Sequence, residues 1–155
     1  MRKATTKPLI AAGGIASGEA MLAAMALGAE GIQAGTLFAL TEESSASEEF
    51  KKRCTELAEG DTMLCLKKIA PTRLIKNALY TRLAEAEDKG ATADELREIL
   101  GRAASKRGIF EGDMESGELE IGQIASAIKT IKPVSEVMKE LISGFEKAKE
   151  RVALL

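Results

Sequence analysis

Two glycine-containing turns hold the residues of this sequence that are best suited to bind a ligand. Gly13 and Gly14 follow a short apolar run, and Gly35 and Thr36 follow a second one about one βα unit later. Glycine lets the backbone approach a ligand closely and exposes N–H groups that bind an anion. These residues therefore predict either a phosphate site, with the N–H groups and the Thr36 hydroxyl as donors, or tight turns that need glycine only for its dihedral angles.

The elements expected around these turns form two consecutive βα units. Residues 9–12 and 30–37 are predicted strands, and residues 17–27 between them are a predicted helix that Gly28 ends. The first strand is a continuous small-apolar run, which is typical of a strand buried on both faces. Parallel neighbouring strands would place both turns at one edge of a sheet. In (β/α)8 barrels the loops after the last two strands commonly build a phosphate site.

Gln33 lies in the middle of the second predicted strand. A buried side-chain amide needs hydrogen-bond partners. Gln33 therefore either contacts a ligand or satisfies the backbone of a neighbouring strand, and its position in the sequence leaves both possibilities open.

Charged clusters elsewhere are interpreted as solvated surface. Arg73 and Lys76, with Lys67 and Lys68, form a basic cluster that we assign to an exposed helix face. The adjacent acids Glu42 and Glu43 are expected to stabilise a helix start or to face water, and we do not assign catalysis to them.

The composition excludes several classes of protein. The chain has 155 residues, a net charge of −2 and no Trp, which counts against binding of nucleic acid or of an acidic membrane surface. Histidine is absent, which excludes Ser-His and Cys-His dyads and most zinc sites, so no metal is predicted. Cys54 and Cys65 lie outside any CxxC pattern and are expected to be buried free thiols. No signal peptide or membrane-spanning run is present, so the cytoplasm is the expected compartment.

The remaining sequence predicts mostly helices. One helix is expected from the capping box Ser45-x-x-Glu48, and another from the capping box Thr92-x-x-Glu95. Residues 63–66 are a predicted extended segment, and residues 72–86 a predicted helix.

The carboxyl-terminal part is expected to contain a loop and two further helices. Residues 108–117 are rich in glycine and acids and predict a loose loop. A short helix is expected over residues 121–131, and an amphipathic helix follows Pro133.

Several of these motifs resemble the carboxyl half of the nitronate monooxygenase family, also known as 2-nitropropane dioxygenase. The flavin-dependent enoyl-acyl-carrier-protein reductase II is a close relative of this family. The resemblance covers essentially the whole chain. The motifs are Pro8-Leu-Ile-Ala-Ala-Gly-Gly-Ile15, Ala26-Leu-Gly-Ala-Glu-Gly-Ile-Gln-Ala-Gly-Thr-Leu-Phe38, Glu42-Glu-Ser-Ser45, Phe50-Lys51, Arg73-Leu-Ile-Lys-Asn77, Gly112-Asp113, Gly117-Glu118 and Gly122-Gln123.

The resemblance implies an α/β fold, the carboxyl-terminal part of an FMN-binding TIM (β/α)8 barrel plus a mostly helical second domain. Residues 1–44 would be the last two βα units with the FMN phosphate site. Residues 45–120 would be the second domain, which covers the flavin, and residues 121–155 would be helices that return to the barrel. The FMN-binding residues implied by the resemblance are Gly13, Gly14, Gln33, Ala34, Gly35 and Thr36.

The resemblance also implies an FMN-dependent oxidoreductase that oxidises alkyl nitronates with dioxygen. The alternative within it is reduction of an enoyl thioester with a nicotinamide cofactor. The family's catalytic histidine and flavin-ring contacts lie in barrel units that precede these residues. We therefore expect a fragment, inactive alone, whose partners are the missing N-terminal barrel half and a small-molecule substrate. Two other hypotheses are a phosphate-binding barrel without flavin and a non-catalytic helical interaction module.

Overall fold

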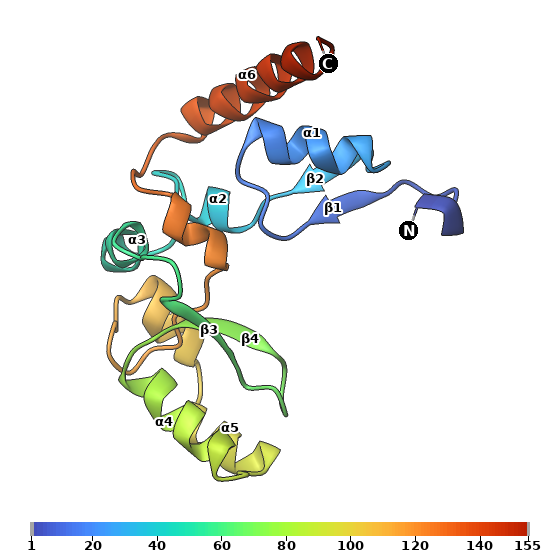
Figure 1. Cartoon of the computed structure of the whole chain (residues 1–155). Coiled ribbons are helices and arrows are strands. Elements are labelled where there is room, and N and C mark those ends of the chain that lie inside the picture. The colour runs from blue at the N-terminus through green and yellow to red at the C-terminus, as the bar shows by residue number, and fades with distance from the viewer. Residues whose placement is uncertain (1, 155) are drawn as a thin grey trace. The chain divides into compact units, whose positions relative to one another are not determined.

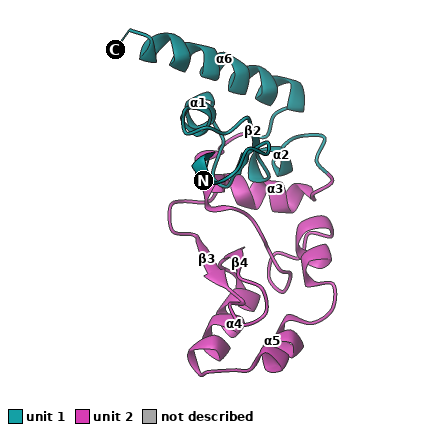
Figure 2. Ribbon diagram, turned by 90° about the vertical axis from the view of Figure 1, so that its right-hand side faces the viewer, with its two compact units in different colours: residues 1–44, 131–155 teal, residues 45–130 magenta. Residues whose placement is uncertain are grey.

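Residues 2–154 are described by the computed structural model and fall into two units. Unit 1 consists of residues 1–44 and 131–155, and unit 2 consists of residues 45–130 (Figure 2). Unit 2 extends to residue 130, beyond the predicted end of the second domain at residue 120. Within residues 2–154, no helix combines the length and the apolar character that crossing a membrane requires.

Unit 1 has an α/β arrangement built on two short parallel strands. Its elements are η1 (Arg2–Ala4), β1 (Ile10–Ala12), α1 (Gly18–Ala26), β2 (Gly31–Gln33), α2 (Thr36–Ala39) and α6 (Val134–Val152) (Figure 1). Strands β1 and β2 pair in parallel, as the sequence predicted. The second strand is shorter than predicted, because the chain turns into α2 after Gly35.

Helix α1 is fixed at both ends by local sequence signals. The Ser17 hydroxyl accepts a hydrogen bond from Ala20 N at 3.2 Å, which is an N-cap. At the other end Gly28 has φ +99°, a conformation that favours glycine. The predicted helix over residues 17–27 is confirmed.

Helix α6 packs on α1 through its apolar face. Val137, Leu141 and Ala148 of α6 are buried, and the two helices lie side by side in Figure 1. At the crossing, Gly18 of α1 touches the α6 backbone. A Cβ placed on Gly18 would lie 1.9 Å from the backbone nitrogen of Phe145, so no side chain fits there.

The start of α6 is held by an acid from far away in the sequence. The Glu43 carboxylate accepts from Val134 N with both oxygens, at 2.9 and 3.1 Å. A carboxylate at a helix N-terminus satisfies an unpaired N–H group and stabilises the helix dipole. Glu43 therefore joins the two sequence segments of unit 1. It stabilises a helix start, as predicted for an acid of this kind.

Unit 2 combines helices with one antiparallel hairpin. Its elements are α3 (Glu48–Thr55), β3 (Thr62–Cys65), β4 (Thr72–Ile75), α4 (Ala78–Asp88), α5 (Ala93–Leu100), η2 (Lys106–Phe110) and η3 (Gln123–Ala127). Strands β3 and β4 pair antiparallel. The extended segment near residues 63–66 is confirmed, as is the capping box at Thr92 and Glu95.

Two helices of unit 2 differ from their predictions. The helix expected over residues 72–86 is divided, because residues 72–75 form β4 and only α4 is helical. Helix α3 is capped by Ser47 and not by Ser45, since the Ser47 hydroxyl accepts from Phe50 N. The Ser47 N–H group also donates to Ile109 O at 2.8 Å, and this tertiary bond fixes where the helix begins.

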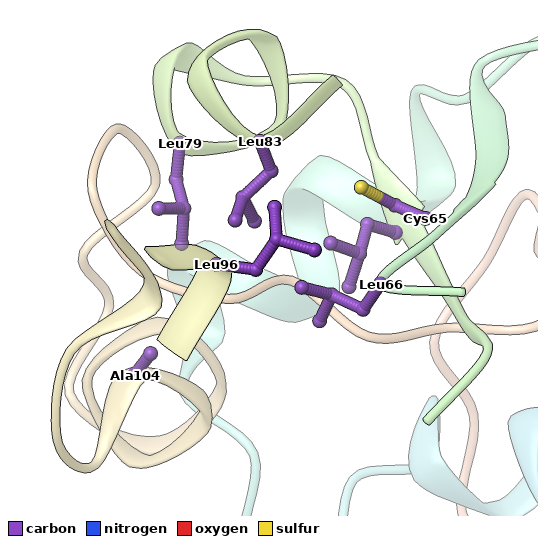
Figure 3. Packing of buried hydrophobic residues seen from close by; sticks show 7 residues of the cluster. Cys65, Leu66, Leu79, Leu83, Leu96 and Ala104 are labelled. Carbon is purple, nitrogen blue, oxygen red and sulfur yellow. The ribbon is translucent and has the colours of Figure 1, made fainter. Parts of the chain in front are cut away.

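The core of unit 2 lies between the hairpin and helices α4 and α5. In Figure 3 the side chains of Leu79 and Leu83 of α4 and Leu96 of α5 gather beside Cys65, the last residue of β3, and Leu66, which follows it. All five are 2% exposed or less, so this cluster gives residues 45–130 a buried apolar core of their own.

Both cysteines are buried free thiols, as predicted. Burial raises the pKa of the Cys54 thiol to about 12. Burial also raises the pKa of Cys65 to about 11, together with the thiol's hydrogen bond to Glu87. The thiolate is the reactive form, so both groups are held in the unreactive form at neutral pH.

We expect both cysteines to react much more slowly with a thiol reagent at pH 8 in the folded chain than in the unfolded chain. The measurement is the rate of reaction with a disulfide dye, with and without denaturant. A cysteine that reacts equally fast in both states would contradict its burial.

Candidate functional site

The two glycine turns leave the sheet side by side. In the parallel register Ala12 is opposite Gln33, and these are the last residues of β1 and β2. Gly13 and Ala34 are therefore the next residues at the same edge of the sheet, its carboxyl-terminal edge. This is where parallel α/β structures bind ligands.

The first turn has an open backbone that only glycine adopts without strain. Gly13 and Gly14 have φ values of +98° and +68°. Both are exposed, and a Cβ on either would meet no atom within 4 Å. Among residues 2–154 no hydrogen bond from the Gly13 or Gly14 N–H group is recorded. The turn thus offers two backbone donors to a bound group.

The second turn leads directly into α2. Gly35 is the N-cap of this helix and Thr36 its first residue. The Gly35 carbonyl accepts from Phe38 N and Ala39 N, which orients the peptide at the start of the helix. Gly35 is exposed and a Cβ there would also meet nothing within 4 Å, while Ala34 and Thr36 are half-buried.

Gln33 differs from its prediction. It is the last residue of β2 and not the middle of a longer strand, and it is exposed. The expected burial of this amide is wrong within unit 1, because β2 pairs with no strand but β1 among the residues that the structure describes there. The same reason applies to β1, whose Ile10 is 55% exposed and not buried. Gln33 nevertheless lies at the same strand edge as the two turns.

The six predicted residues therefore lie at one edge of the strand pair. Gly13 and Gly14 from one turn, and Gln33, Ala34, Gly35 and Thr36 from the other, all occupy the carboxyl-terminal edge of the β1–β2 pair. Backbone N–H groups and a hydroxyl are donors suited to an oxyanion such as a phosphate. Among the described residues, no group of three or more acidic or cysteine side chains is placed to hold a metal ion.

The basic cluster predicted on a helix face is distributed differently. Arg73 belongs to β4, where its Nη1 donates to Thr62 O at 2.9 Å. Lys68 lies after β3 and donates to the carbonyls of Gly90 and Ala91. The prediction of a helix face is wrong for Arg73, because residues 72–75 form β4 and pair with β3.

Sequence reasoning missed the part that Asn77 plays. Its side-chain oxygen accepts from Tyr80 N at 2.9 Å, which caps α4. Its amide nitrogen donates to Met114 O and Gly117 O, at 3.0 and 2.9 Å. The residue thus ties a helix start to a loop 37 and 40 positions away. An Asn directly before an apolar helix was the available signal for the cap, but no local signal indicated the loop.

The loop that Asn77 holds is packed more tightly than its composition suggested. A Cβ on Gly117 would lie 2.3 Å from the Gly108 Cα and 2.4 Å from Asp113 O. Gly108 belongs to η2 and is buried. Residues 111–117 form a connecting loop, as predicted, while residues 108–110 belong to η2. The loop is not loose, since these glycines allow close backbone packing.

Replacing Asn77 with alanine should destabilise unit 2 by about 2 kcal/mol, because the cap and two hydrogen bonds to loop carbonyls are lost together. Asn77→Ser keeps a capping oxygen and should recover about half of this loss. The measurement is the free energy of unfolding of unit 2 from amide hydrogen exchange in α4. Equal stability of both variants and the unmodified chain would contradict this role.

Comparison with known proteins places these features in one family. The chain matches the family model described as nitronate monooxygenase over residues 1–144. A probable nitronate monooxygenase from Staphylococcus aureus (strain JH9) is 32% identical over 140 residues, which cover 88% of this chain and 38% of that protein.

Two solved structures resemble the fold closely. FabK from Thermotoga maritima has a TM-score of 0.90 and 32% identity, and the match covers 98% of this chain and 48% of FabK. Nitroalkane oxidase from Streptomyces ansochromogenes has a TM-score of 0.78 and 27% identity, covering 97% of this chain and 42% of that one. The chain thus spans half or less of the length of these relatives.

The family match extends over both glycine turns, the hairpin motif and most of α6. It confirms the resemblance drawn from the sequence motifs, and the chain belongs to the nitronate monooxygenase family.

Proposed function

We propose that this chain is the phosphate-binding part of an FMN-dependent oxidoreductase that oxidises alkyl nitronates with dioxygen. The observation that carries the proposal is the pair of open glycine turns at one edge of a parallel strand pair. Membership of the nitronate monooxygenase family supports the type of reaction. FMN, when bound, supplies the capacity to accept electrons from an organic substrate.

The residues present fit the phosphate end of FMN. Gly13 and Gly14 offer N–H groups on an open backbone, where a side chain at positive φ would bring strain. Gly35 and Thr36 start a helix at the same strand edge, which favours a negative group. In this proposal the chain binds and orients the cofactor by its phosphate, within the last two βα units of a TIM barrel.

We infer that the chemistry at the flavin ring is carried out by residues other than these 155. The 155 residues contain no histidine, so the most common general base is absent from them. Burial of the ring supplies much of a cofactor's affinity. We therefore expect the chain alone to bind FMN more weakly than micromolar and to oxidise no nitronate.

The test is complementation with a relative. Residues 1–155 are co-expressed with the part of the Staphylococcus aureus protein that precedes the matching region, and the purified pair is assayed. We expect bound flavin and oxygen uptake with propane-2-nitronate, and neither from the chain alone.

The second candidate function is reduction of an enoyl thioester with a nicotinamide cofactor, which the structural similarity to FabK and the sequence resemblance favour. The same purified pair is assayed for oxidation of NADH and NADPH with crotonyl thioester. Activity there without nitronate oxidation would favour this second function. A purified pair without flavin would overturn both.

A further inference from the structure

Unit 2 contains a cleft of its own, lined by both polar and apolar side chains. Its volume is about 450 Å³, which lies in the range of small-molecule pockets. The side chains that matter for its chemistry are Thr62, Met63, Arg73, Gln123, Ile124 and Ser126. They come from β3, β4 and η3, and two of the motifs shared with the family, those that contain Arg73 and Gln123, meet here.

Backbone pairing brings these distant residues together. Ile121 N donates to Arg73 O at 3.2 Å, and Leu74 forms an antiparallel bridge with Glu120. This pairing continues the hairpin by a third extended segment and sets η3 beside β4. Lys129 lies shortly after η3, and its Nζ donates to Leu57 O at 2.5 Å. Most of the cleft is therefore lined by hydrogen-bonded elements, with the turn at Glu59 and Gly60 on its border.

Arg73 carries a positive charge into this cleft. The side chain is half-buried, and Nη1 donates to Thr62 O at 2.9 Å. Among residues 2–154, no carboxylate lies within ion-pair distance of its guanidinium. Glu59, which also borders the cleft, is exposed to solvent. A guanidinium presents several N–H donors in a planar fork that matches a phosphate or a carboxylate.

The remaining walls suit the organic part of a ligand. Met63 is 43% exposed although it is apolar, and Ile124 is half-buried beside it in the lining. Gln123 and Ser126 add neutral hydrogen-bonding groups. A cleft of this volume is larger than a bare ion requires.

From this arrangement we propose that the cleft binds the anionic head of a small organic ligand, a phosphate monoester or a carboxylate. Arg73 holds the head, and Met63 and Ile124 contact the organic part. The site lies wholly within residues 45–130 and needs neither FMN nor its chemistry. It therefore goes beyond the proposed function and stands or falls separately from it.

The experiment titrates the 155-residue chain with butyl phosphate, butyrate and butanol, which share one organic part and differ in the head group. Amide chemical shifts report where each compound binds. We expect saturable shifts at Arg73 and Gln123 with at least one of the two anions and none with butanol. The stronger of the two anions identifies the head group.

Matched variants assign the binding to the guanidinium. Arg73→Gln should weaken binding of the anion about tenfold, because a hydrogen bond to a charged group is lost. Arg73→Lys keeps the charge and should recover part of the affinity. Lys76→Gln removes the same charge from an exposed position nearby and should leave affinity unchanged.

Three results would overturn the proposal. They are equal shifts with butanol, anion shifts confined to Gly13, Gly14, Gly35 and Thr36, and equal weakening by Lys76→Gln and Arg73→Gln. If Arg73→Gln disturbs the fold, as its amide spectrum would show, Gln123→Ala replaces it. That variant keeps the Arg73–Thr62 hydrogen bond and should still weaken binding, and unchanged affinity would count against the site.

Discussion

Replacing Gly18 with alanine should destabilise unit 1 by about 3 kcal/mol, which is the upper range for overpacking a tight contact. The added Cβ would lie 1.9 Å from Phe145 N and 2.2 Å from the Gly144 carbonyl carbon. These are backbone atoms of α6, so no side chain can rotate away. Helix α6 would have to move off α1, and the buried contacts of Val137 and Leu141 would be lost with it.

Gly144→Ala is the matched control at the same crossing. Its Cβ would lie 3.4 Å from Gly18 N, which is an ordinary contact. Gly144 is inside α6, where alanine is favoured over glycine by about 1 kcal/mol. We expect this variant to be neutral or slightly more stable. Hydrogen exchange of the α1 and α6 amides measures both, and equal effects of the two variants would show that the close helix contact is not present.

Replacing Gly14 with alanine should weaken binding of FMN to the chain about tenfold or more. A left-handed conformation costs a residue with a Cβ about 1–2 kcal/mol, and Gly14 has φ +68°. The turn would relax toward negative φ, and its N–H groups would no longer point toward one bound phosphate.

Gly90→Ala separates backbone strain from cofactor binding. Gly90 has φ +86°, and a Cβ added there would meet open space, as at Gly14, but Gly90 lies in unit 2 after α4. Both variants should lose a similar free energy of unfolding, about 1–2 kcal/mol. Only Gly14→Ala should weaken FMN binding. The measurement is an NMR titration, and loss of FMN affinity in both variants would contradict a specific role of the turn.

Local signals explain which parts of the fold could be predicted. The Ser17 cap and Gly28 define α1 from the residues themselves, and the Thr92–Glu95 capping box defines the start of α5. The two glycine turns could be located because each glycine directly follows an apolar run, which marks the end of a strand in a βα unit. The backbone of the site is therefore visible in the sequence.

Tertiary pairing explains what could not be predicted. Ile75, Leu79 and Leu83 follow a helical spacing, yet Ile75 N donates to Leu119 O and β4 pairs with β3. The segment that contains Leu119 is more than forty residues away, so no window of sequence contains both sides. The packing of Gly117 against Gly108 was hidden because it too depends on tertiary contacts.

Binding of FMN compared with riboflavin tests the central claim most directly, since the two differ only in the phosphate. The claim is that the Gly13–Gly14 and Gly35–Thr36 turns hold this group. We expect FMN to bind the 155-residue chain about tenfold more tightly than riboflavin, because charge-assisted hydrogen bonds are lost with the phosphate. The FMN shifts should centre on the amides of those four residues. Equal affinity for both compounds, or FMN shifts confined to residues 45–130, would contradict the claim.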